Sequence, residues 1–183
     1  MLFRAVVTLA TAALALANPL TARQNSNTNP QIEPILNNLA IVNRQTIANV
    51  DTMQANGTAT DGTVGTQVQN LITLFSGAAS DILAIPVSSG STTQSPTDIQ
   101  LSRVLGEAIQ VTATGLSGLQ AQATVPNFSA MISQLDPTVA DTINALNTTL
   151  PGATGFVHLL MLDAQQFLVK EGAWPETLAA LGF

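Results

Sequence analysis

The chain contains no cysteine and no tyrosine, and charged residues make up only 9% of its 183 residues. Without cysteine the protein can form no disulfide, no thiolate metal site and no thiol nucleophile. Aromatic residues number six Phe and one Trp, so the core has to be built from aliphatic side chains. A mature chain of about 160 residues buries roughly 70% of its unfolded surface, which is enough to fold without disulfides.

Positive charge is also scarce, because five Lys and Arg stand against eleven Asp and Glu. Nucleic-acid binding needs a basic surface that neutralises phosphates, so we expect no nucleic-acid partner. An anionic membrane would not attract such a chain by charge either. Hydrophobic residues account for 46% of the sequence, and this fraction indicates a packed core rather than a disordered chain.

The first residues look like a secretory signal peptide at 1–17. Arg4 precedes a largely apolar run that ends with Ala15 and Ala17 in the small-x-small cleavage pattern. Because this run is too short to cross a bilayer, we expect no transmembrane segment and a secreted protein, extracellular or in the cell wall. The polar residues 18–29 predict a disordered leader or a short propeptide, followed by a single helical domain at 30–183.

Apolar residues recur with the 3.6-residue period of an amphipathic helix, and the alternation typical of strands is not found at useful length. The Asp136-Pro137 pair resembles an N-cap and first helical residue, which predicts a break in the fourth helical region. The fold class is therefore all-α, a bundle of four or five main amphipathic helices. We expect helices at about 30–55, 64–84, 97–122, 127–148 and 153–170, with a short one at 175–181.

The stretch 153–170 is apolar nearly all round, since Leu159, Leu162 and Val169 lie outside its main apolar arc. Such a helix either lies at the centre of a bundle or is partly covered by something other than its own chain. The third helix carries three glycines, at 106, 115 and 118, which weaken it by up to ~1 kcal/mol each. We expect these glycines to allow close helix packing, with room for a ligand as the alternative.

A catalytic triad is not indicated. His158 is the only histidine, and Asp163 lies five residues on, about 140° around a helix, where it is badly placed to orient the imidazole. The sequence has no G-x-S-x-G elbow and no Gly-rich phosphate loop. With one histidine and no cysteine, we predict no metal site, no cofactor and no enzymatic activity.

Paired carboxylates, Asp136 with Asp141 or Glu171 with Glu176, could in principle support glycoside hydrolysis. Simpler interpretations exist for both pairs, with Asp136 as a helix cap and Glu176 as a first-turn acid that complements the helix dipole. A different kind of site is suggested by three N-glycosylation sequons in predicted loops or at helix ends, at Asn56, Asn127 and Asn147.

Apolar helix surface is the main remaining chemical feature. With little charge nearby, a helix can turn an apolar face outward onto a wax, a polyester or a lipid. The same residues could instead enclose a fatty acyl chain between helices. We expect five apolar side chains to contribute to such an acyl-accommodating interior: Phe75, Leu116, Phe156, Leu160 and Phe167. Two alternatives stay open, a structural cell-wall mannoprotein without a ligand and a hydrolase of unrecognised type.

The order of these segments resembles a known family. A signal peptide precedes an Ile-rich helix (IEPILNNLAIVNRQTIANVDTM) and a second helix (VQNLITLFSGAASDIL), and a Ser/Thr-rich linker and two further amphipathic stretches follow. Over residues 32–170 this pattern is similar to the hydrophobic surface binding protein A family, which includes fungal cell wall galactomannoproteins. The resemblance implies a fungal, secreted helical protein that adsorbs to hydrophobic surfaces. It further implies fatty-acid binding or recruitment of a secreted esterase as partner, without catalytic residues of its own.

Overall fold

A computed structural model of the protein describes residues 26–120, 122 and 124–183, and none of these residues lies in a β-strand. Four helices are long: α2 (Asn29–Ala55), α3 (Asp61–Leu83), α4 (Asp98–Ser117) and α5 (Phe128–Thr149). Three short helices follow: α6 (Ala153–Met161), α7 (Gln165–Glu171) and α8 (Pro175–Leu181). The prediction of an all-α helical bundle is confirmed.

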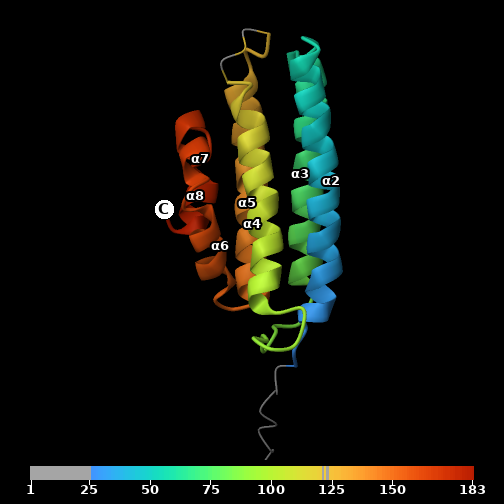
Figure 1. Ribbon diagram of the computed structural model, residues 1–183, viewed down its shortest axis with the longest axis vertical. Helices are drawn as coiled ribbons and strands as arrows, with labels where there is room; N and C mark the ends of the chain where they lie inside the picture. Colours follow the sequence, from blue (N-terminus) through green and yellow to red (C-terminus); the bar gives the residue numbers. More distant parts are fainter. Residues whose placement is uncertain (1–25, 121, 123) are drawn as a thin grey trace, which may run out of the picture.

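The helices form three layers, which are visible side by side in Figure 1. α2 and α3 pack against each other, α2 packs on α4, and α3 packs on α5. The short C-terminal helices cover the opposite side of the α4–α5 layer, where α6 contacts both α4 and α5, α7 contacts α4, and α8 contacts α5. The layer formed by α6, α7 and α8 is therefore the outermost on that side.

Aliphatic side chains from every layer form one core, as the composition predicts. Leu36 of α2, Leu71 of α3 and Leu105 of α4 are fully buried. Val157 and Leu168 carry the same core into the outer layer. Two of the few aromatic side chains lie fully inside it, Phe75 and Trp174.

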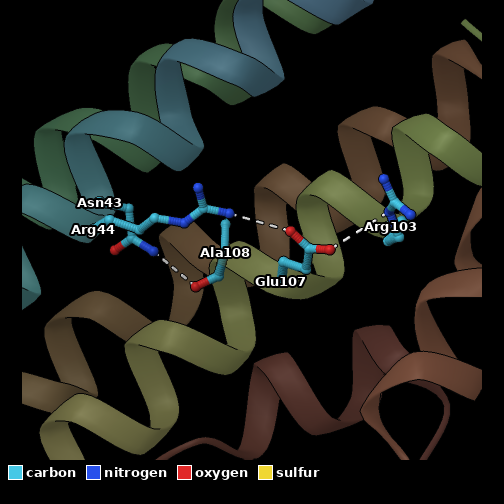
Figure 2. Close-up of polar contacts among 5 residues, drawn as sticks. All are labelled: Asn43, Arg44, Arg103, Glu107 and Ala108. Atoms are coloured by element: carbon cyan, nitrogen blue, oxygen red, sulfur yellow. Dashed lines mark hydrogen bonds and ion pairs between the residues drawn. The ribbon is translucent and has the colours of Figure 1, made fainter.

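Polar contacts fix the register of α2 against α4 (Figure 2). Asn43 is fully buried, and its side-chain amide donates to the carbonyl oxygen of Ala108 at 2.8 Å. The carbonyl oxygen of the same side chain accepts a hydrogen bond from the hydroxyl of Thr112 at 3.0 Å. Nearby, Arg44 and Arg103 both pair with Glu107, but these exposed ion pairs add little stability. Asn43 is thus a buried, specific polar link between the two helices, and Asn29 of α2 makes a second one by donating to the Asp98 carboxylate of α4 at 2.7 Å.

Two glycines of α4 allow close packing, as expected. A Cβ atom at Gly115 would collide with the side chain of Ile47 on α2. A Cβ atom at Gly106 would lie 3.2 Å from Cδ1 of Leu160 on α6. Gly118 is the C-cap of α4, and a Cβ atom there would lie 3.0 Å from the side-chain oxygen of Gln54 on α2. The third helix ends at Ser117 and is therefore shorter than the predicted 97–122.

The structure corrects two other helix predictions. The fourth region is not split, because α5 continues through Pro137, and Asp136 caps no second piece. Proline costs a helix interior about 3 kcal/mol, so packing on both sides of α5 has to offset that loss. The predicted helix 153–170 is broken by a turn at 162–164 into α6 and α7. This turn directs α7 along α4.

The predicted signal peptide and residues 18–25 of the leader lie outside the described residues. The end of the predicted leader is ordered by contacts with the loop that precedes α4. Ser26 accepts a hydrogen bond from the amide of Ser89, and the Thr28 amide donates to the Ser88 hydroxyl. Asn29 already belongs to α2. Of the helices that the structure describes, none is both long and apolar enough to cross a membrane.

Candidate functional site

The outward side of α6 is apolar. Val157 and Met161 are fully buried against the bundle, as the inner face of the helix requires. Four apolar side chains on its other sides are exposed and define what we term the α6 strip: Phe156 (38% exposed), Leu159 (62%) and Leu160 (43%) of α6, and Leu162 (46%) directly after its end. α6 belongs to the outermost layer, where α4, α5 and α8 contact it and this strip stays open to solvent.

The α6 strip is also uncharged. Residues 153–162 contain no Asp, Glu, Lys or Arg, and the next charged residues along the chain are Asp163 and Lys170. The four side chains together expose on the order of 400 Å² of apolar surface, comparable with the largest apolar patch on typical monomers, which is often functional. Val169 on α7 is 60% exposed and adds to the apolar surface of this layer.

The five predicted ligand-contacting residues fall into separate groups. Phe75 of α3 and Leu116 of α4 are fully buried core residues. Phe156 and Leu160 belong to the α6 strip, while Phe167 is a partly buried residue of α7 packed on the core. Sequence periodicity finds apolar positions but does not separate core from surface. The ligand-binding role of the five residues stays a prediction.

Within the part of the chain that the structure describes, none of the five residues lines the surface hollows between α2 and α3, between α3 and α5, or on the loop at 89–94. A hollow of about 180 Å³ between α2 and α3 includes Asn38, Thr73 and Asp81 in its wall. A hollow of about 470 Å³ between α3 and α5 includes Asp141 and Asn144. The third, of about 400 Å³, lies on the Ser/Thr-rich loop at 89–94. The hollow on the loop has polar walls, and the α2–α3 hollow is lined by polar and apolar side chains alike. The α3–α5 hollow is mostly apolar, with Ala79, Leu83 and Ala145 in its wall.

His158 has a structural role. Its Nδ1 atom lies 2.8 Å from the carbonyl oxygen of Leu181, and its ring stacks on Phe183 with 4.3 Å between centroids. A carbonyl oxygen only accepts hydrogen bonds, so Nδ1 is the protonated nitrogen. His158 therefore joins the end of α8 to α6. Neither the Leu181 carbonyl oxygen nor the Phe183 ring is a nucleophile that the imidazole could activate.

Asp136 binds the beginning of α8. Its two carboxylate oxygens accept hydrogen bonds from the amides of Glu176 at 2.8 Å and Thr177 at 2.7 Å. The aspartate is only 2% exposed, whereas Asp141, its predicted partner for hydrolysis, is exposed to solvent. Asp136 is a helix cap, as the sequence predicted, but it does not cap a helix that begins at Pro137. It caps α8, where the Glu176 amide that it binds lies 40 residues away in sequence.

Glu171, which the sequence offered only as one half of a carboxylate pair with Glu176, has surroundings that the sequence did not reveal. It ends α7, is only 5% exposed, and accepts a hydrogen bond from the indole N–H of Trp174 on one oxygen, Oε2. The other oxygen, Oε1, is buried without a hydrogen-bond partner. Burial raises the pKa of this carboxyl to about 7, against smaller opposing effects of the Trp174 bond and the Lys170 charge. In the sequence, only the nearby Trp174 indicated that the Glu171 carboxyl group could be buried.

The three sequons differ in their surroundings. Asn56 is exposed at the C-terminal end of α2. Asn127 donates its side-chain amide to the Asp61 carboxylate at 2.6 Å. Asn147 lies in the last turn of α5, where its side-chain oxygen accepts from the amide of Gly152 and the hydroxyl of Thr154. Asn56 is thus the sequon whose side chain is most open to modification.

Within the described part of the chain, no three His, Asp or Glu side chains are grouped so that they could hold a metal ion. No protein-family model matches the chain, and no curated protein matches it significantly. The functional argument therefore depends on the residues and their geometry, above all on the α6 strip.

Proposed function

We propose that the chain is a secreted, non-enzymatic protein that binds hydrophobic surfaces or lipids through the α6 strip. The observation that carries the proposal is the placement of an uncharged apolar helix in the outermost layer, with Leu159 and Leu162 exposed by 62% and 46%. Burial contributes about 25 cal/mol per Å², so covering half of a 400 Å² strip contributes about 5 kcal/mol. This is sufficient for reversible adsorption.

An extended surface fits the strip better than a second copy of the chain. Two such strips facing each other would bury about 800 Å² in total, less than the roughly 1,000 Å² of a specific stable interface. An internal acyl cavity is less well supported, because Phe75 and Leu116 are fully buried in the core. The strip is also free of charge, and binding should therefore not depend on ionic strength.

The resemblance to hydrophobic surface binding proteins and the predicted signal peptide support the same proposal. Both come from the sequence, and they are independent of the geometry of α6. The fungal origin, the cell-wall location and the esterase partner belong to this proposal only through the resemblance.

The test is depletion of the purified protein from solution onto polystyrene beads and onto zwitterionic lipid vesicles at several salt concentrations. The double variant Leu159→Asn/Leu162→Asn should weaken adsorption about 70-fold, because at half coverage the two side chains lose about 100 Å² of contact, which contributes about 2.5 kcal/mol. Wild-type binding should stay constant between low and high salt.

A matched control removes two aliphatic side chains of similar exposure elsewhere. Ile41→Asn/Leu83→Asn changes residues that are 55% and 56% exposed on α2 and α3. This variant should adsorb as the wild type does. Equal losses in both double variants would show that adsorption depends on general hydrophobicity and not on α6. A wild-type protein that stays in the supernatant would refute the proposal outright.

A further inference from the structure

The junction between α7 and α8 contains a buried acid. Glu171 closes α7, and Gly172 then reverses the chain with a φ of +67°. Trp174, which precedes α8, is only 1% exposed and donates its indole N–H back to Glu171. The remaining carboxyl oxygen, Oε1, is buried without a partner. A neutral carboxyl group is tolerated at such a site, whereas a charged one loses its hydration without compensation.

The segment that carries this acid consists of two short helices that depend on contacts with the rest of the bundle. α7 and α8 have seven residues each, and helices of this length are not stable in water by themselves. Besides the buried side chains Leu168, Trp174 and Leu181, the Asp136 carboxylate holds the start of α8, and His158 holds its end at the carbonyl oxygen of Leu181. The side chain of Gln120 donates to the carbonyl oxygens at the end of α7. These contacts are the ones that break if the segment opens, and they are separate from those among the four long helices.

We propose that Glu171 is a pH-sensitive latch, whose neutral carboxyl group keeps the α7–α8 segment on the bundle and whose ionised form lets the segment open. The inference does not depend on what the α6 strip binds, because its readouts concern the free protein.

The pH range over which the latch opens follows from the raised pKa of Glu171. Its pKa is raised from 4.5 to about 7 in the docked state. The docked state therefore keeps its proton at pH values where an open segment has lost it. Docking is strongest below pH 4.5 and weakens as the pH rises to about 7, above which it stays weak. A difference of about 2.5 pKa units corresponds to a change of up to about 300-fold in the opening equilibrium.

Other charged groups on the neighbouring helices have different roles. Lys170 lowers the pKa of Glu171, but burial outweighs it. Arg103 pairs with Glu107, and Asp98 accepts a hydrogen bond from the amide of Ser91. Asp136 holds the α8 amides. The remaining titratable groups are Asp141 on α5, His158 on α6, Asp163 in the turn between α6 and α7, and Glu176 on α8.

Native-state amide hydrogen exchange of the full mature chain tests the latch, because it detects small open populations. The amide of Leu178 bonds the carbonyl oxygen of Trp174 and reports on α8. After correction for the intrinsic exchange rate, its opening constant should rise about 150-fold between pH 4.5 and pH 8, because half of the open segments are already ionised at pH 4.5. The rise should be absent in Glu171→Gln and unchanged in Glu176→Gln, which alters an exposed acid of the same segment.

Comparison with core amides separates opening from global unfolding. At every pH the Leu178 amide should open more readily than the amide of Leu71 in α3. Equal opening constants for the two amides, or a wild-type Leu178 value that does not change with pH, would overturn the proposal. If Glu171→Gln does not fold, Glu171→Met removes the same charge without adding a second polar group, and its opening constant should likewise be independent of pH.

Discussion

Replacement of Asp136 tests how α8 is held on the bundle. The backbone amides of Glu176 and Thr177, at the start of α8, both donate hydrogen bonds to this carboxylate. Asp136→Ala removes both acceptors and leaves the Thr177 amide buried without a partner, since Thr177 is fully buried. Hydrogen bonds to a charged group contribute about 1.5–3 kcal/mol each, so the docking of α8 should weaken by about 3–5 kcal/mol.

Two readouts distinguish local from global effects in urea titrations of this variant. Trp174 is the only tryptophan of the chain and directly precedes α8, so its fluorescence reports on the docked segment. Far-UV circular dichroism reports on the whole bundle. At pH 4.5, where docking of the α7–α8 segment is strong, the two wild-type transitions should coincide. In Asp136→Ala the fluorescence transition should move to lower urea than the dichroism transition, because α8 leaves first.

Asp141→Ala is the matched control, since it removes an exposed acid from the same helix. Its unfolding free energy should stay within about 0.5 kcal/mol of the wild type, as is usual for surface substitutions. The reasoning would be refuted by an Asp136→Ala protein that is equally stable and whose two transitions still coincide.

The α2–α4 packing predicts that Gly115→Ala destabilises the protein by about 1–3 kcal/mol in urea unfolding, because the new methyl group collides with Ile47. Gly77→Ala in α3, where a Cβ meets no atom within 4 Å, should instead stabilise it by up to about 1 kcal/mol. In protein expressed through a glycosylating secretory pathway, mass spectrometry should find glycan at Asn56 more than at the other two sequons. Preferential occupancy of the others would contradict this.

Local patterns predicted most of the helices. The predicted helix at 30–55 corresponds to α2 at 29–55, and the one at 175–181 corresponds to α8. These predictions succeed because helix periodicity, prolines and caps are read within a few turns of the chain. Thr60 and Thr97 illustrate this, since each caps its own helix through residues three positions on.

The failures concern contacts between distant segments. Asp136-Pro137 has the local form of a helix start, but the carboxylate serves α8, whose amides lie 40 and 41 residues away. Pro137 stays inside α5 because its neighbours on both sides are packed in the core. Similarly, Glu171 resembles a surface acid in sequence, and only the return of the chain at Gly172 buries it beside Trp174.

The sequence by itself determined the helical class, the aliphatic core and the low charge of this protein, because these follow from composition and from periodicity over a few turns. It also showed that residues 153–170 are apolar on nearly every side. Only the tertiary structure decided that α6 lies in the outermost layer, with Leu159 and Leu162 toward solvent, and that Glu171 is buried. Burial depends on which segments meet in space, and the period of one helix contains no information about its neighbours.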